Sequence, residues 1–195
     1  SNDCNQIGSV GIPLTHTTVS IFDLDTGKEL TYNQQGEVCV TGPNTMLGYY
    51  KNPEATAEII VRHKDGLDWV HYGDIGYMTE DGMLFIVDRI KRMIVRHDGF
   101  KVFPSMIEKT IASHEAVQPC CVVGIPDKEH SQGKLPAAHI VLAPQFSGQK
   151  SDVQQLAALC QKELPEYSQP VDYVFRDSLP LTPIGKVDYR ALEEK

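Results

Sequence analysis

The sequence lacks the long apolar runs and the basic excess that membrane and nucleic-acid proteins need. No apolar run approaches the roughly 20 residues of a membrane span, and the first residues show no basic-then-apolar leader pattern. Lys and Arg number 18 against 26 Asp and Glu, for a formal net charge of −8. Nucleic acids and anionic membranes both require a basic patch. We therefore expect a cytoplasmic protein with no nucleic-acid partner and no membrane span.

A disulfide framework is also missing. The five cysteines make an odd count and contain no C-x-x-C spacing. Cys120 and Cys121 are adjacent, and neighbouring side chains of a strand point to opposite faces. The pattern predicts small apolar side chains in a reducing compartment.

The sequence has none of the common metal and phosphate motifs. The seven histidines are dispersed, and His114-Glu115 lacks the second histidine of a zinc-binding H-E-x-x-H. We therefore expect surface or core histidines and no metal site. Gly185-Lys186 resembles the end of a phosphate-binding P-loop, but Pro180 replaces the first glycine and Val187 follows the lysine.

The chain up to residue 88 reads as strands and turns. Alternation in "TVSIFDLDTGKEL" and "GEVCVTGP" predicts two strands, and Glu80-Asp81-Gly82 predicts a hairpin turn. "NPEATAEII" (52–60) predicts a short helix, because Asn52 can cap it and Pro53 suits its first turn.

Residues 89–195 mix helices with strands. Asp98-Gly99 predicts a hairpin, and Ser105 with Glu108 forms a capping box for a helix over 105–114. A second helix is expected over 151–164, and short strands at "PCCVVGIP", "AAHIVLA" and "VDYVF". The predicted class is α+β, with a β-rich part over residues 1–88 and a small α+β domain over 89–195.

Lys186 is the first candidate for chemistry. Pro180 and Pro183 each fix a φ angle, and Gly185 lets a ligand or another backbone come close. A compact ammonium on such a stiff loop suits a developing oxyanion or a phosphate oxygen. An exposed loop lysine without a role is the alternative.

Asp74 and Arg89 form the second candidate. Asp74 lies between Gly73 and Gly76, where we expect a turn that exposes its carboxylate. A carboxylate there can accept two hydrogen bonds from the vicinal diol of a ribose. A purely structural Asp–Arg pair is the alternative.

Four longer stretches of the sequence resemble a known protein family. "YGDIGYMTEDGMLFIVDRIKRMIVRHDGFKVFPSMIE" (72–108) and "LPLTPIGKVDYRAL" (179–192) resemble the adenylate-forming superfamily, which contains acyl-CoA synthetases, luciferases and peptide-synthetase adenylation domains. "GSVGIPLTHTTVSIFD" (8–23) and "GEVCVTGPNTMLGYYKNPEATAEII" (36–60) resemble the preceding segments of the same family. The resemblance covers nearly the whole chain.

The resemblance implies an ATP-dependent ligase that forms an acyl-adenylate and then a thioester. Its cofactors would be ATP, Mg2+ and CoA or the pantetheine of an acyl carrier protein, and its substrate a carboxylic acid. By the same resemblance, Lys186 is catalytic, Asp74 and Arg89 bind ATP, and Lys91 is the hinge. Gly99 and Phe100 would face the thiol. The expected architecture is a β-barrel-like end of a large domain (1–88) followed by a C-terminal lid domain (89–195).

The sequence departs from the family pattern in two ways, and two other functions are kept as alternatives to the ligase. The family's upstream Ser/Thr/Gly-rich phosphate loop is absent, so we expect an inactive fragment that matches about the last third of such an enzyme. "MIVRHDGF" is one residue longer than the family pattern. An amino-acid adenylation enzyme that loads a carrier protein, and a non-catalytic carrier-docking module, are the alternatives.

Overall fold

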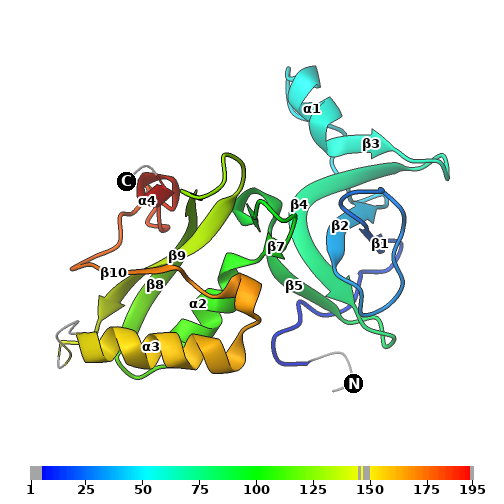
Figure 1. Cartoon of the computed structure of the whole chain (residues 1–195). Helices are drawn as coiled ribbons and strands as arrows, with labels where there is room; N and C mark the ends of the chain where they lie inside the picture. Colours follow the sequence, from blue (N-terminus) through cyan, green and yellow to red (C-terminus); the bar gives the residue numbers. More distant parts are fainter. Residues whose placement is uncertain (1–5, 145, 147–149, 194–195) are drawn as a thin grey trace. The chain divides into compact units, whose positions relative to one another are not determined.

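The computed structural model describes residues 6–144, 146 and 150–193, with the side chains of 150–152 left out. The chain divides into two compact units, Ser1–Lys91 and Arg92–Lys195. The expected boundary lay between residues 88 and 89. Each unit is described by itself below (Figure 1).

The first unit is built on an antiparallel five-stranded sheet. Its strands are β1 (Thr18–Phe22), β2 (Gly36–Thr41), β3 (Ile60–Arg62), β4 (Asp68–Met78) and β5 (Leu84–Arg89). They are ordered β1-β2-β4-β3, and β5 also pairs with β4. The long strand β4 pairs with β3 through its first residues and with β5 through its last ones. Among the described residues the sheet stays open, so the barrel-like end is not a closed barrel.

One short helix, α1 (Pro53–Ile59), precedes β3. Asn52 caps it, accepting a hydrogen bond from the Ala55 N–H at 3.0 Å, and Pro53 occupies the first turn. Both features are as predicted, because capping depends only on residues within one turn. Phe22, Cys39 and Trp69 pack together as a buried cluster of this unit.

The second unit places two helices on one face of a small sheet (Figure 1). After a 3-10 turn (Ile90–Arg92), the hairpin β6 (Ile94–Val95) and β7 (Lys101–Val102) leads to α2 (Pro104–Ala112), β8 (Val117–Pro126) and β9 (Lys134–Leu142). Then follow α3 (Lys150–Glu163), a 3-10 turn (Glu166–Ser168), β10 (Asp172–Phe175) and α4 (Arg190–Glu193). The sheet order is β10-β9-β8, with β9 antiparallel to β8 and parallel to β10.

The two faces of this sheet belong to different cores. The core on the helix side contains the following buried residues: Ile94, Val102, Ile107, Ile111, Val122, Ala138, Ile140, Leu156, Cys160 and Leu164. The other face packs Cys121 and Val123 against Leu179 and Leu192 of the C-terminal segment. Cys120 packs against the helix-side core, so the two adjacent cysteines point to opposite faces as predicted.

The start of α2 differs from the prediction. The helix begins at Pro104 and its N-cap is Phe103, which makes no side-chain cap hydrogen bond. Ser105 therefore lies inside the first turn, and the predicted capping box is wrong. Glu108 instead accepts a hydrogen bond from the Val122 N–H at 2.8 Å and pairs with Arg92. A tertiary partner has replaced the local one.

A search of the described helices finds none that combines the length and apolar character of a membrane span.

Candidate active site

Lys186 lies on the arm of a tight hairpin. Leu181 and Val187 form an antiparallel bridge, and the Thr182 N–H donates to the Lys186 carbonyl at 2.7 Å. The Gly185 N–H donates to the Thr182 carbonyl at 2.9 Å, and Gly185 has a φ of +79°. This is a turn closed by a left-handed glycine, a common three-residue hairpin connection. The conformation explains why glycine precedes the lysine.

The hairpin is fixed at its base and free at its tip. Leu179 is buried before it, and Val187 and Tyr189 pack on the same core after it. Leu181 and Ile184, by contrast, are 62% and 78% exposed. Lys186 is also exposed, and its ammonium has no hydrogen bond or ion pair within the part of the chain that the structure describes. The fold thus presents an unpaired cation on a rigid arm.

Asp74 and Arg89 face each other across β4 and β5. They are directly paired in the strand register, and Arg89 Nε lies 2.8 Å from Asp74 Oδ1. The Arg89 guanidinium also donates to the Tyr72 carbonyl at 3.0 Å. The Asp74 side chain is 25% exposed and that of Arg89 is 62% exposed. The pair is held in place, yet both groups can be reached from solvent.

The expected turn around Asp74 is wrong, because β4 continues through it as a strand, with a bulge against β2 between His71 and Ile75. Gly73 allows this with a φ of +71°. At Gly76 a side chain would meet the Phe85 carbonyl oxygen at 2.4 Å, so only glycine permits the strand pairing there. The register of β4 and β5 shifts just after Ile75. Such bulges re-aim neighbouring side chains, here those of Asp74 and Arg89.

Lys91 is the last residue of the first unit and lies exposed in the 3-10 turn Ile90–Arg92. The next residue, Arg92, is anchored to the second unit. Its guanidinium pairs with Glu108 and lies over the Tyr189 ring, with Cζ 5.9 Å from the ring centroid. Lys91 is therefore exposed to solvent, whereas the side chain of the next residue, Arg92, is held by the second unit.

Gly99 and Phe100 belong to the β6–β7 turn. Like the hairpin of Lys186, this turn is closed by a glycine with a positive φ. The Gly99 N–H donates to the Arg96 carbonyl at 3.0 Å, and Gly99 has a φ of +83°. Asp98 accepts hydrogen bonds from the Arg96 guanidinium at 3.0–3.2 Å, and this contact holds the pKa of the carboxyl below its usual range. A side chain at Gly99 would meet nothing within 4 Å, so the turn leaves open space there.

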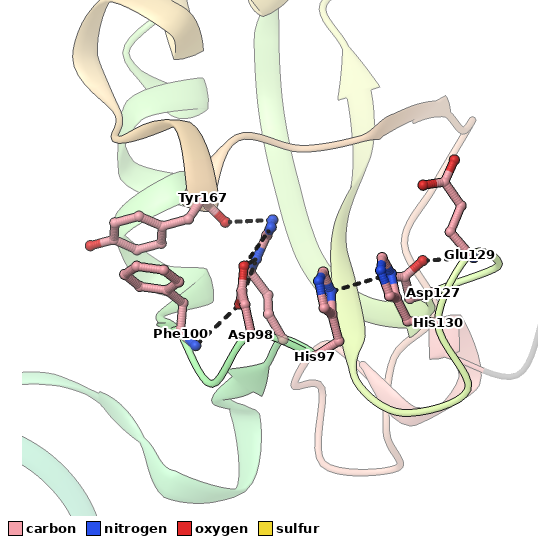
Figure 2. Close-up of polar contacts among 8 residues, drawn as sticks. His97, Asp98, Phe100, Asp127, Glu129, His130 and Tyr167 are labelled. Carbon is pink, nitrogen blue, oxygen red and sulfur yellow. Dashed lines mark hydrogen bonds and ion pairs between the residues drawn. The ribbon is translucent and has the colours of Figure 1, made fainter.

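Phe100 stacks on Tyr167 of the 3-10 turn Glu166–Ser168, with ring centroids 4.5 Å apart (Figure 2). The Arg96 guanidinium donates to the Tyr167 carbonyl at 3.3 Å. Phe100 is half exposed despite the stack. The turn that contains Gly99 is therefore held in place by contacts with Tyr167, a residue far along the chain.

Family models match two parts of the chain. Residues 106–186 match the model described as "AMP-binding enzyme C-terminal domain", and residues 1–50 match the model "AMP-binding enzyme". The chain belongs to the adenylate-forming superfamily.

Individual members of the superfamily align over nearly the whole chain. A long-chain-fatty-acid–CoA ligase of Bacillus subtilis (strain 168) is 37% identical over 98% of this chain and 32% of its own length. A 4-coumarate–CoA ligase-like 1 of Arabidopsis thaliana is 37% identical over 96% of this chain and 33% of its own length. The ATP-bound structure of MatB from Rhodopseudomonas palustris is 29% identical and superposes with a TM-score of 0.82, covering 96% of this chain and 35% of that one. The chain spans about a third of the length of the curated relatives that it matches.

The structure brings some of the predicted residues of this superfamily member together. Asp74 and Arg89 form one pair in the first unit, and Gly99 and Phe100 share one turn in the second. Lys186 lies on a separate hairpin of the second unit. The roles carried over by resemblance stay predictions.

Sequence reasoning missed a cluster beside the β6–β7 turn. His97 Nδ1 lies 3.2 Å and His130 Nδ1 lies 2.8 Å from Asp127 Oδ2. A hydrogen bond from the Glu129 backbone N–H, and the two imidazoles, hold the pKa of the Asp127 carboxyl below its usual range. The histidines looked dispersed because they come from two different loops. The only feature of the sequence that pointed to this cluster was His97, which directly precedes the predicted Asp98-Gly99 turn.

Proposed function

We propose that this chain supplies the C-terminal region of an AMP-forming acid–thiol ligase of the acyl-CoA synthetase type. In the first step a carboxylate oxygen attacks the α-phosphorus of ATP, and the bond to pyrophosphate breaks. In the second step a thiol sulfur attacks the acyl carbonyl carbon, and AMP leaves. The names of the aligned relatives, two CoA ligases, support this reaction type.

The observation that carries the proposal is the free ammonium of Lys186 on its rigid hairpin. Negative charge on oxygen is redistributed when the carboxylate attacks phosphorus, and a cation brought close to that oxygen stabilises it. The exposed Leu181 and Ile184 beside it give the tip an apolar surface that can dock against the rest of an active site. Lys186 is thus suited to act in the adenylation step.

ATP is the substrate that the Asp74–Arg89 pair fits. A carboxylate has room for about four hydrogen bonds, so Asp74 can keep its contact to Arg89 and still accept from a ribose diol. The exposed guanidinium can reach a phosphate or ribose oxygen. Mg2+, which neutralises phosphate oxygens in such reactions, completes the proposed cofactor set.

The second step would use the open side of the β6–β7 turn. Apart from its two neighbours in the chain, no described residue lies within 4 Å of where a Cβ of residue 99 would be, which leaves room for a narrow pantetheine arm beside Phe100. Lys91 would be the hinge on which the second unit turns between half-reactions, and such domain motions assemble each catalytic constellation in turn. We propose CoA as the acceptor, with carrier-protein pantetheine as the variant to be tested.

The test joins the upstream two thirds of the aligned Bacillus subtilis ligase to this chain and compares Lys186→Ala with Lys162→Ala. Lys162 is a matched control because it is an exposed lysine of the same unit, 79% exposed on α3. We expect Lys186→Ala to slow fatty-acid-dependent pyrophosphate exchange by about 100-fold or more. Thioester formation from a supplied acyl-adenylate should persist, and Lys162→Ala should leave both steps unchanged.

Each other outcome changes the proposal. Equal exchange by the Lys186→Ala and Lys162→Ala chimeras would remove the lysine from the chemistry. Transfer to a pantetheinyl carrier but not to CoA would favour the carrier-loading alternative. A folded chimera without any exchange, together with carrier binding by this chain, would favour the docking-module alternative.

A further inference from the structure

His97, Asp127 and His130 converge at one edge of the second unit (Figure 2). His97 lies in the β6–β7 turn, and Asp127 and His130 lie in the loop between β8 and β9. The nearest oxygen of Asp127 lies 3.2 Å from Nδ1 of one histidine and 2.8 Å from Nδ1 of the other. The two imidazole rings are stacked, with centroids 3.4 Å apart and planes 6° apart.

This donor set is that of a transition-metal site. Two imidazole nitrogens and a carboxylate oxygen suit zinc, whose bonds to them are about 2.0–2.2 Å long. Tetrahedral geometry then separates neighbouring donors by about 3.3–3.5 Å. The His97–Asp127 separation of 3.2 Å is close to this value, and the His130–Asp127 hydrogen bond has to open by about half an ångström. The two stacked rings also have to rotate apart, because each imidazole binds an ion in its own plane.

Contacts with neighbouring backbone groups keep the three donor side chains close together. Asp127 is only 5% exposed in its side chain, and its carboxylate accepts a hydrogen bond from the Glu129 backbone N–H at 2.9 Å. Such outer contacts orient metal ligands. At Gly133, a side chain would meet the His97 backbone nitrogen at 2.3 Å, so glycine lets the β8–β9 loop lie directly against the β6–β7 turn. The two ligand-bearing segments are thus in backbone contact.

The cluster also borders open space. His97, Asp127 and His130 line a cavity of about 570 Å³, together with Arg96, Lys128 and Glu129 among others. The histidine side chains are 30% and 44% exposed. A bound ion would therefore keep a fourth position accessible to water or to a ligand atom from a partner.

We propose that His97, Asp127 and His130 form a binding site for a divalent transition ion of the zinc class. The site is independent of the ligase proposal. Its imidazoles exclude it as a magnesium site, because Mg2+ selects oxygen ligands. Since His97 directly precedes Asp98-Gly99, a bound ion would cross-link the β6–β7 turn to the β8–β9 loop.

A second cluster in the first unit serves as the comparison. Glu37, Cys39 and His71 also lie within reach of one another. There His71 is already occupied on both nitrogens, by Glu37 at 2.8 Å and by His63 at 2.9 Å, and the Cys39 thiol is fully buried. The closed hydrogen bonding and the lack of access make it the weaker candidate for an ion.

The test titrates the untagged, metal-free chain with Zn2+ against a chromophoric chelator. The variants are His130→Ala, the His97→Ala/His130→Ala double variant, and two controls, Cys39→Ala for the other cluster and His114→Ala for a histidine elsewhere in the second unit. We expect one Zn2+ per wild-type chain and an affinity loss of about 100-fold or more in His130→Ala. Both controls should bind as the wild type does.

Circular dichroism of each variant checks that it is folded, and X-ray absorption of the zinc-loaded wild type gives a readout without mutation. We expect a first shell of nitrogen and oxygen at about 2.0–2.2 Å with imidazole scattering. A sulfur shell near 2.3 Å, or loss of binding in Cys39→Ala alone, would assign the ion to the other cluster. Full binding by the folded double variant, or no binding by the wild type, would overturn the proposal.

Discussion

At the scale of single residues, the cysteines show what burial does to a reactive side chain. Cys39, Cys120, Cys121 and Cys160 are free, and three of them are buried. Burial raises the pKa of Cys39, Cys120 and Cys121 to about 12. A thiol that keeps its proton is a small apolar group rather than a nucleophile. The prediction that the cysteines form no disulfide framework is confirmed for these four, and Cys4 lies outside the described residues.

We expect Cys39 and Cys121 to resist iodoacetamide at pH 8 in the folded chain. Raising the pKa from 9.0 to about 12 lowers the thiolate fraction by about 1000-fold, so labelling should slow at least that much relative to the chain in guanidinium. The unfolded chain loses these protons first, so the free energy of unfolding should fall as the pH rises from 9 towards 12. Peptide mapping by mass spectrometry measures the labelling. Equal rates in the folded and unfolded chain would contradict the prediction.

At the scale of elements, one ion pair joins the start of the second unit to its core. Arg92 pairs with Glu108 of α2, and the same carboxylate accepts the Val122 N–H of β8. Both side chains are about four-fifths buried. Among the described residues, the exposed Lys91 beside them makes no such contact. This contrast favours Lys91 over Arg92 as the position of the proposed hinge.

Glu108→Ala should destabilise the second unit by about 2–3 kcal/mol, because the Arg92 guanidinium loses its carboxylate partner and the Val122 N–H loses its acceptor. The only tryptophan, Trp69, is buried in the first unit, so its fluorescence reports that unit alone. In urea, the circular dichroism transition should shift while the fluorescence midpoint stays. Lys109→Ala, an exposed position on the same helix, is the control. A shift of the fluorescence midpoint would show that the two units unfold as one.

At the scale of the whole molecule, the chain consists of two units whose boundary in the sequence falls between Lys91 and Arg92. Each has its own sheet and its own buried cluster. Among the described residues, no named strand pairs across the boundary. The boundary between the units coincides with Lys91, the proposed hinge.

Limited trypsin digestion should therefore nick the chain first after Lys91. An exposed lysine in a single 3-10 turn can unfold locally at little cost, whereas Arg92 is held by Glu108. Mass spectrometry of the first products should find cleavage between Lys91 and Arg92, and Lys91→Gln should delay it. First cuts within either unit, at Lys51 or Lys64 for example, would count against a hinge at this position.

Local signals in the sequence predicted much of the fold. The Asn52 cap, the Glu80–Gly82 hairpin and the Asp98-Gly99 hairpin are confirmed, because each depends on residues only a few positions apart. The helix over 151–164 is confirmed as α3, in which Leu156 and Cys160 are fully buried. Predictions failed where a distant partner intervened. Glu108 left the capping box for Arg92, and Asp74 lies in a strand because β2 and β5 pair with β4 on both sides.

The sequence by itself determined the class of the fold, the family and the residue types available for chemistry. Alternation, capping and motif order are local properties, so they can be read without coordinates. Only the tertiary structure decided which side chains meet. It paired Asp74 with Arg89, placed Lys186 on an exposed hairpin, and brought His97 to Asp127 and His130. Such encounters depend on strand register and loop packing between residues far apart in the chain, which no local pattern specifies.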